Sequence, residues 1–88
     1  MDNSQINEKL KEVSGWEMQN GHLTKTYQLD DFNASLKFVN AVGELAEKAD
    51  HHPDILIQYN KVKLSLRTHD QDSITEKDFN LAGKIEQL

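Results

Sequence analysis

The chain has 88 residues, enough for a single domain over residues 1–88 and too few for two independent cores. It has no cysteine, which excludes disulfides, thiolate metal sites and a nucleophilic cysteine, and its formal charge of −5 disfavours non-specific binding to nucleic acid or anionic membranes. No apolar run approaches the roughly 20 residues that span a bilayer, and the first residues lack the pattern of a secretory signal, so we expect a soluble cytoplasmic protein.

The chain begins with a predicted helix and a predicted hairpin. The helix is expected from about Gln5 to Val13, with Ser4 as its N-cap and Gly15 at its end. An Asn-Gly dipeptide between two short strand-like runs is a strong hairpin signal. It predicts paired antiparallel strands at Trp16–Gln19 and His22–Leu29.

A long helix is predicted next, capped by Asp30 or Asp31 and ending near Ala49 before Pro53. Its wide apolar face is typical of a helix that lies on a sheet. That face consists of one stripe and a second row beside it: Phe32, Leu36, Val39, Gly43 and Ala46, flanked by Phe38, Val42, Leu45 and Ala49.

Two more strands are predicted from alternating apolar residues. The third strand contains Ile55, Ile57 and Tyr59, and the fourth contains Val62, Leu64 and Leu66 between polar side chains. This alternation predicts a sheet with one buried face and one face in water.

The last predicted helix has clear start signals. Thr75 is the expected N-cap, Asp78 completes a capping box, and Ile74 can pack on Phe79. The expected buried face comprises Leu81, Ala82, Ile85 and Leu88. The whole order is α-β-β-α-β-β-α, which predicts an α+β fold: a four-stranded antiparallel sheet with the helices packed on one face.

Three of the four histidines lie where predicted elements end. His51 and His52 directly precede the only proline, and His69 follows the fourth strand, whereas His22 sits beside the hairpin turn as a solvated residue. Side chains at such positions project from a rigid scaffold without belonging to the core. These three histidines are therefore the candidates for chemistry.

Carboxylates accompany these histidines. Glu47 lies one helical turn before His51, Asp50 precedes the histidine pair, Asp70 follows His69, and Asp78 lies in the first turn of the last helix. Because imidazole titrates near neutral pH, such a set can run proton transfers without a metal or a nucleophile. Two other interpretations stay open at this point: polar element ends without function, and a three-histidine zinc site. Adjacent histidines rarely point the same way, which counts against the zinc site.

Several runs of residues stand at the spacing of one known family. They are Glu47-Lys48-Ala49-Asp50-His51-His52-Pro53, Tyr59-Asn60-Lys61-Val62, Thr68-His69-Asp70, and Thr75-Glu76-Lys77-Asp78 with Leu81-Ala82. Together they resemble the signature of the pterin-4a-carbinolamine dehydratases. The resemblance covers Phe32 to Gln87, and Gly15-Trp16 falls where that family has its early tryptophan.

The resemblance implies an enzyme that removes water from 4a-hydroxytetrahydropterin to give quinonoid dihydropterin, which recycles the cofactor of aromatic amino-acid hydroxylases. It implies no metal and no cofactor. By resemblance, His51 and His69 are the acid and base, and His52 binds the pterin. The remaining residues implied to orient histidines or to bind and enclose the substrate are Glu47, Asp50, Pro53, Asp78 and Trp16, although Trp16 fits an ordinary core role equally well.

The resemblance also implies self-association as a dimer or tetramer. One departure from the family is Ser73, which stands where the family commonly has glycine. If that position needs a left-handed backbone, Ser73 adopts it at a cost or the loop follows another path. The alternative function, from another class, is a non-enzymatic protein-binding module on the same fold.

Overall fold

The helices and strands follow one another in the predicted α-β-β-α-β-β-α order. A computed structural model describes residues 1–88 and contains three α-helices, four strands and one short 3-10 turn. In chain order these are α1 (Asn3–Leu10), β1 (Glu17–Gln19), β2 (His22–Gln28), α2 (Phe32–Ala49), β3 (Asp54–Gln58), β4 (Lys61–Leu66), η1 (His69–Gln71) and α3 (Glu76–Glu86). No helix has the length and apolar character needed to cross a membrane.

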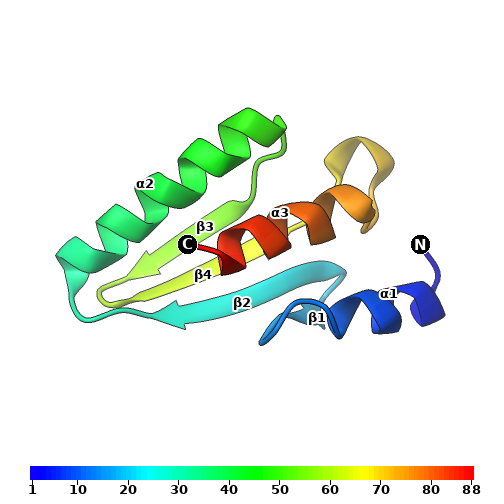
Figure 1. The fold of residues 1–88 in the computed structure, drawn as a ribbon, viewed down its shortest axis with the longest axis horizontal. Coiled ribbons are helices and arrows are strands. Elements are labelled where there is room, and N and C mark those ends of the chain that lie inside the picture. The colour runs from blue at the N-terminus through cyan, green and yellow to red at the C-terminus, as the bar shows by residue number, and fades with distance from the viewer.

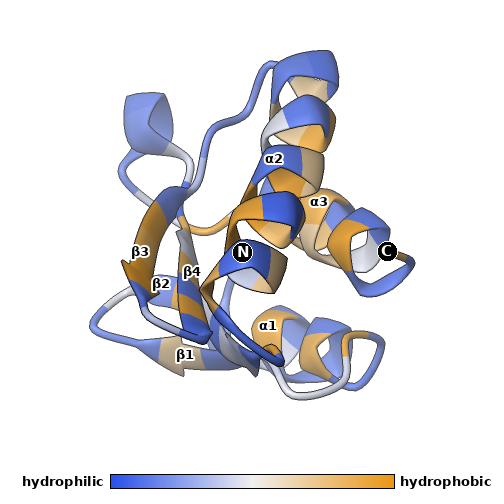
Figure 2. Ribbon diagram, turned by 90° about the vertical axis from the view of Figure 1, so that its left-hand side faces the viewer, coloured by the Kyte–Doolittle hydropathy of each residue, from blue (hydrophilic) through white to orange (hydrophobic).

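The four strands form one antiparallel sheet in the order β1-β2-β4-β3. All three helices lie on the same face of this sheet, as the side view in Figure 2 shows. The predicted α+β fold is therefore confirmed. Between sheet and helices lies a core of apolar side chains, which includes Leu23, Val62, Leu64 and Leu66 from the sheet, Val42 and Ala46 from α2, and Phe79, Leu81, Ala82 and Ile85 from α3.

The start of the chain differs from the prediction. Asp2, not Ser4, is the N-cap of α1: its carboxylate accepts from the Gln5 amide at 2.8 Å, and the Gln5 side chain accepts from the Asp2 amide at 2.9 Å. Gln5 stands three residues after Asp2 and completes this reciprocal capping box, whereas Asn7 stands three residues after Ser4. The helix ends at Leu10, before the predicted Val13, and Gly15 takes a left-handed conformation in the turn that follows.

Four apolar positions predicted on the buried faces of the helices are exposed. Three are on α2, namely Phe32, Leu36 and Ala49, whereas the buried residues of that helix are Ser35, Val42 and Ala46. Leu88 follows the end of α3 and is exposed rather than buried. The predicted stripe was wrong here because the apolar surface of α2 is wider than its contact with the sheet.

The third strand is shorter and more exposed than predicted. It ends at Gln58, and Tyr59 lies in the two-residue turn to β4 with a positive φ of 55° and an exposed side chain. Because β3 is an edge strand, Ile55 and Leu56 are also exposed. Asp54 pairs with Ser65, so the connection into β3 and the connection out of β4 lie at the same end of the sheet (Figure 1). This end carries all three candidate histidines.

Candidate active site

His51 is directed inward by the way α2 ends. Asp50 adopts a left-handed conformation (φ 51°, ψ 43°), and the His51 amide donates to the Ala46 carbonyl at 3.1 Å, which closes the helix. The chain then leaves the helix axis, and His51 is 9% exposed whereas Asp50 is exposed. The contribution of Asp50 that the structure describes is therefore a backbone one: it sets the direction in which His51 leaves the helix.

A hydrogen-bonded pair joins His51 to the first turn of α3. The Nε2 atom of His51 lies 2.6 Å from Oδ1 of Asp78, whose side chain is fully buried. The other oxygen of Asp78 accepts from the Thr68 hydroxyl and from the Thr75 amide, each at 2.9 Å. The capping box predicted for Thr75 and Asp78 is confirmed, and the same carboxylate also binds the histidine.

These contacts define which nitrogen of His51 carries its proton. A carboxylate can only accept, so Nε2 of His51 donates to Asp78, and in the neutral ring Nδ1 keeps its lone pair. Nδ1 has no protein partner, and since no buried side-chain nitrogen or oxygen lacks one, Nδ1 reaches solvent. The geometry thus presents one oriented imidazole nitrogen at the molecular surface. A depression of about 210 Å³ lies beside His51, lined also by Ala49, Lys77, Asn80, Leu81 and Lys84.

His52 and His69 are both exposed. The Nε2 atom of His52 contacts the Glu47 carboxylate, which is exposed one turn earlier on α2. His69 is the first residue of η1, and its side chain forms no hydrogen bond with the protein. The fold thus brings the three histidines to one end of the sheet without joining them in one hydrogen-bond network, and no group of three or more His, Asp or Glu side chains is arranged to hold a metal ion.

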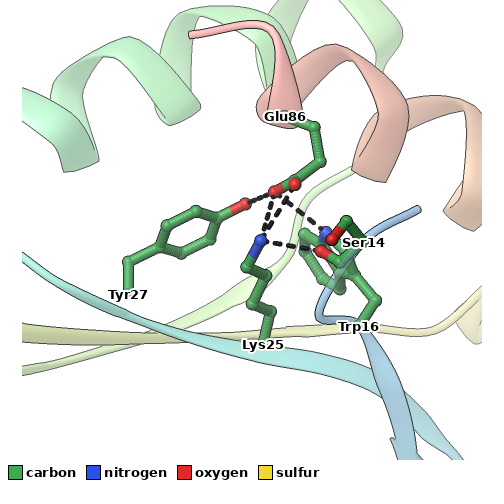
Figure 3. Close-up of polar contacts among 5 residues, drawn as sticks. All are labelled: Ser14, Trp16, Lys25, Tyr27 and Glu86. Atoms are coloured by element: carbon green, nitrogen blue, oxygen red, sulfur yellow. Dashed lines mark hydrogen bonds and ion pairs between the residues drawn. The ribbon is translucent and has the colours of Figure 1, made fainter.

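Trp16 lies in a different cluster, toward the other end of α3. Its indole is buried, and Nε1 donates to Oε2 of Glu86 at 3.3 Å. Figure 3 shows Lys25 and Tyr27 directed at the same carboxylate, with Lys25 also donating to the Ser14 carbonyl. Glu86 is about two helical turns from Asp78 on α3. This placement fits the core role of Trp16, and its predicted role as a pocket wall stays a prediction.

The charge state of this second cluster is set by its hydrogen bonds. Burial raises the pKa of the Tyr27 phenol, and the hydrogen bond to Glu86 raises it further. For Glu86, burial acts to raise the pKa, but the hydrogen bonds from Lys25, Tyr27 and Trp16 outweigh it and hold the pKa below the ordinary value. The ionised carboxylate therefore ties α3 to β2 and to the turn before β1.

Comparison with known proteins identifies the family. The family model described as "Pterin 4 alpha carbinolamine dehydratase" matches residues 1–88. The chain belongs to this family. The resemblance seen in the histidine and proline motifs is thereby confirmed.

Relatives in this family cover the whole chain. A protein from Thermomicrobium roseum is 48% identical over 88 residues, which is 100% of this chain and 95% of the relative. One from Sulfolobus acidocaldarius is 41% identical over 88 residues, 100% of this chain and 97% of the relative. Both are named, provisionally, as pterin-4-alpha-carbinolamine dehydratases.

Two solved structures have the same fold. The crystal structure of a protein described as a transcriptional coactivator/pterin dehydratase from Brucella melitensis superposes with a TM-score of 0.94, at 31% identity over 99% of this chain and 95% of that one. A pterin dehydratase-like protein described as a RuBisCO assembly factor in the alpha-carboxysome gives a TM-score of 0.66 at 18% identity, covering 82% of this chain and 83% of that one. At that identity the second likeness concerns the fold alone.

The structure shows which residue of the loop after His69 adopts the left-handed conformation. The left-handed residue of the loop is Asp72 (φ 49°, ψ 42°), while Ser73 pairs with Thr68 in a β-bridge. Of the two alternatives given for this position, a left-handed Ser73 is therefore not observed, because Asp72 carries that conformation instead. Asp tolerates it better than most residues, because its short polar side chain can form local hydrogen bonds.

Sequence analysis missed one partner of the site and the whole of the second cluster. Thr68 is buried and donates its hydroxyl to Asp78, although it was noted only as the neighbour of His69. The cluster around Glu86 was missed entirely. Its signal was available, because Lys25 and Tyr27 alternate with outward-facing residues and so share the helix-covered face of β2 with Leu23.

Proposed function

We propose that this chain is a dehydratase that removes water from 4a-hydroxytetrahydropterin to give quinonoid dihydropterin. The observation that carries the proposal is the His51–Asp78 pair, in which a buried carboxylate orients an imidazole whose other nitrogen reaches solvent. Family membership over the whole chain supplies the substrate class. The same carboxylate caps α3, but the cap uses Oδ2, and the bond to His51 is made by the other oxygen, Oδ1.

The reaction needs one acid and one base. The C4a–O bond breaks as a proton reaches the departing hydroxyl, and the N5–H proton is lost to a base, so that a C4a=N5 double bond forms and water leaves. His51 and His69 come from different connections at one end of the sheet and are the proposed pair. Near pH 7 a neutral imidazole can accept a proton and an imidazolium cation can donate one. One neutral histidine and one protonated histidine are therefore enough for this reaction.

The substrate-binding residues are proposed around this pair. His52, supported by Glu47, would bind the pterin ring, and Asp50 and Pro53 would hold the turn that presents both histidines. Asp78 acts through His51 and does not need to touch the substrate. No metal or other cofactor takes part in this proposal, and a zinc-dependent reaction predicts that a chelator abolishes turnover and that zinc restores it.

Self-association is proposed on a separate observation. Strand β3 lies at the edge of the sheet, where it exposes Ile55 and Leu56 and leaves backbone groups unpaired. Its ribbon is largely orange, the colour of hydrophobic residues, in Figure 2. Phe32 and Leu36 on α2 add further exposed apolar surface. Such edges and patches are typically covered in a functional protein. A dimer or tetramer would cover them.

A dehydration assay on the purified protein tests the proposal. It follows the decay of freshly generated 4a-hydroxytetrahydropterin by ultraviolet absorbance, with and without the protein. Acceleration in proportion to protein concentration supports an enzyme. A folded protein that leaves the spontaneous rate unchanged favours the alternative, a protein-binding module on the same fold.

A further inference from the structure

The two proposed acid–base histidines are held in different ways. His51 is fixed by its hydrogen bond to the buried carboxylate of Asp78. His69 has no such partner: it is exposed, and no side-chain hydrogen bond links its ring to the protein. The place of the His69 ring therefore depends on the backbone that carries it, which is the three-residue turn η1.

Residue 72 determines the shape of that turn. The Asp72 amide donates to the His69 carbonyl at 3.1 Å, and Asp72 itself is the left-handed residue that ends η1. Thr68 and Ser73 pair at the base of the turn. A left-handed conformation is unfavourable for a residue other than glycine, so contacts that hold Asp72 also hold His69.

Arg67 supplies those contacts. Its Nη2 atom donates to the Asp72 carbonyl at 2.6 Å and to Oδ1 of Asp72 at 2.9 Å, and its Nε lies 3.3 Å from the same oxygen. Its Nη1 atom donates to the Gly21 carbonyl at 2.7 Å. The guanidinium thus bridges the end of η1 and the turn of the β1–β2 hairpin, and the Arg67 side chain is only 21% exposed although that of Asp72 is 91% exposed.

The hairpin turn is shaped to receive this guanidinium. Gly21 has a φ of +79°, and a Cβ added there would lie 2.5 Å from Nη1 of Arg67. A side chain at this position would displace the guanidinium from the Gly21 carbonyl. The Asn-Gly turn therefore makes the hairpin and also leaves room for the bridge to η1.

We infer that Arg67 is a positioning residue for His69. By binding Asp72 and the Gly21 carbonyl together, it fixes the turn that carries His69 to the hairpin, and so to the rigid sheet. The expected effect of Arg67 on turnover rests on the proposed function, whereas its expected effect on the position of the turn does not. Because the Asp72 partner of this ion pair is almost fully exposed, the pair adds little to global stability, and the effect of Arg67 should be local to the turn.

Amide hydrogen exchange tests the structural half. In Arg67→Ala, we expect the amides of Asp72 and Ser73 to exchange at least ~10-fold faster than in the wild type. The core amides of β4 should change their exchange rate only as far as the change in global stability requires. The melting temperature should fall by less than about 8 °C. Lys63→Ala is the matched control, since it removes the same charge from β4, the strand that Arg67 directly follows, and Lys63 forms no hydrogen bond to η1. Unchanged exchange at Asp72 and Ser73 in Arg67→Ala would overturn the inference.

A double-mutant cycle tests the link to His69. Arg67→Ala should lower kcat at least ~3-fold with little change in KM, because a misplaced acid–base group mainly affects the chemical step. In a His69→Ala background the same substitution should have no further effect on kcat. An equal fall in both backgrounds would overturn the inference, because it would mean that Arg67 acts on the protein generally. Arg67→Lys, which keeps the charge but lacks the fork that reaches both partners, should give an intermediate kcat and serves if Arg67→Ala does not fold.

Failure of the proposed function is distinguishable from failure of this inference. If the wild-type protein does not dehydrate the substrate, the proposed function fails. The inference is then decided by exchange at Asp72 and Ser73 and by the His69 imidazole signals in nuclear magnetic resonance spectra. These signals should change in Arg67→Ala and stay unchanged in Lys63→Ala, and the reverse would contradict the inference.

Discussion

Replacing Asp78 by Asn should reverse the proton arrangement of His51. The Thr75 amide can only donate, so the oxygen of the new side chain must occupy the Oδ2 position, where that amide and the Thr68 hydroxyl donate at 2.9 Å. Its NH₂ group then faces Nε2 of His51 at the position of Oδ1. Because an NH₂ group can only donate, Nε2 must become an acceptor, and in the neutral ring the proton moves to Nδ1.

The expected changes follow from counting the bonds. All three hydrogen bonds to residue 78 are kept, but all three lose the carboxylate charge. Because a neutral amide is also less costly to bury than a carboxylate, part of that loss is offset, and we expect a stability loss of about 1 kcal/mol. For a domain of this size that lowers the melting temperature by about 4–8 °C. Turnover should fall at least ~10-fold, because the solvent-facing nitrogen no longer has the required protonation state while water and His69 substitute in part.

Two measurements on the same sample check this reasoning. Long-range nitrogen–proton spectra of the imidazoles report which nitrogen of His51 is protonated, and the dehydration assay reports turnover. Asp30→Asn is the control, since Asp30 is an exposed carboxylate before α2 with no side-chain hydrogen bond. A variant in which the His51 proton has moved to Nδ1 but turnover equals that of the wild type would refute the assigned role of the His51–Asp78 pair.

Three further predictions concern other parts of the chain. His52→Ala should raise the apparent KM at least ~3-fold with little change in kcat, as expected when binding common to ground and transition states is lost, and His22→Ala should change neither; a fall in kcat alone would contradict this. Glu86→Gln should cost about 2 kcal/mol at pH 7 in urea unfolding. The pKa of Glu86 in the folded protein lies below the ordinary value of 4.5. The stabilisation by the ionised carboxylate is therefore complete above pH 4.5 and is lost as the pH falls through the folded-state pKa. The variant and the wild type should accordingly converge in stability at low pH. An equal difference at pH 7 and pH 3 would be inconsistent with an ionised Glu86. Sedimentation should detect a homo-oligomer at micromolar concentration, and a stable monomer would contradict the proposed coverage of β3 and α2.

The sequence predicted the elements that local chemistry determines. The Asn-Gly turn, the Asp31 cap and the box formed by Thr75 and Asp78 all act over four residues or fewer, so the hairpin and the starts of α2 and α3 could be located. Alternation predicted the buried face of β4 because that strand is central. The same reasoning overestimated burial in β3, since a sequence does not state which strand lies at the edge.

The candidate site was predicted in its residues but not in its contacts. Motif spacing indicated His51, His69 and Asp78, and the structure joins two of them, His51 and Asp78, by a hydrogen bond. Which carboxylate binds which histidine depends on the angle at which α2 ends and on the depth of α3, and these are properties of packing. For the same reason the bond from Thr68 to Asp78 and the bridge from Arg67 to Gly21, 46 residues apart, could not be found from sequence alone.

Replacing both His51 and His69 by Ala tests whether these two residues perform the dehydration. Each acid–base group typically contributes ~10²–10⁴-fold, so a protein lacking both should dehydrate 4a-hydroxytetrahydropterin at close to the spontaneous rate. Circular dichroism establishes that the variant is folded, and His22→Ala in the same assay should match the wild type. A folded double variant that keeps most of the wild-type activity would show that other groups perform the reaction.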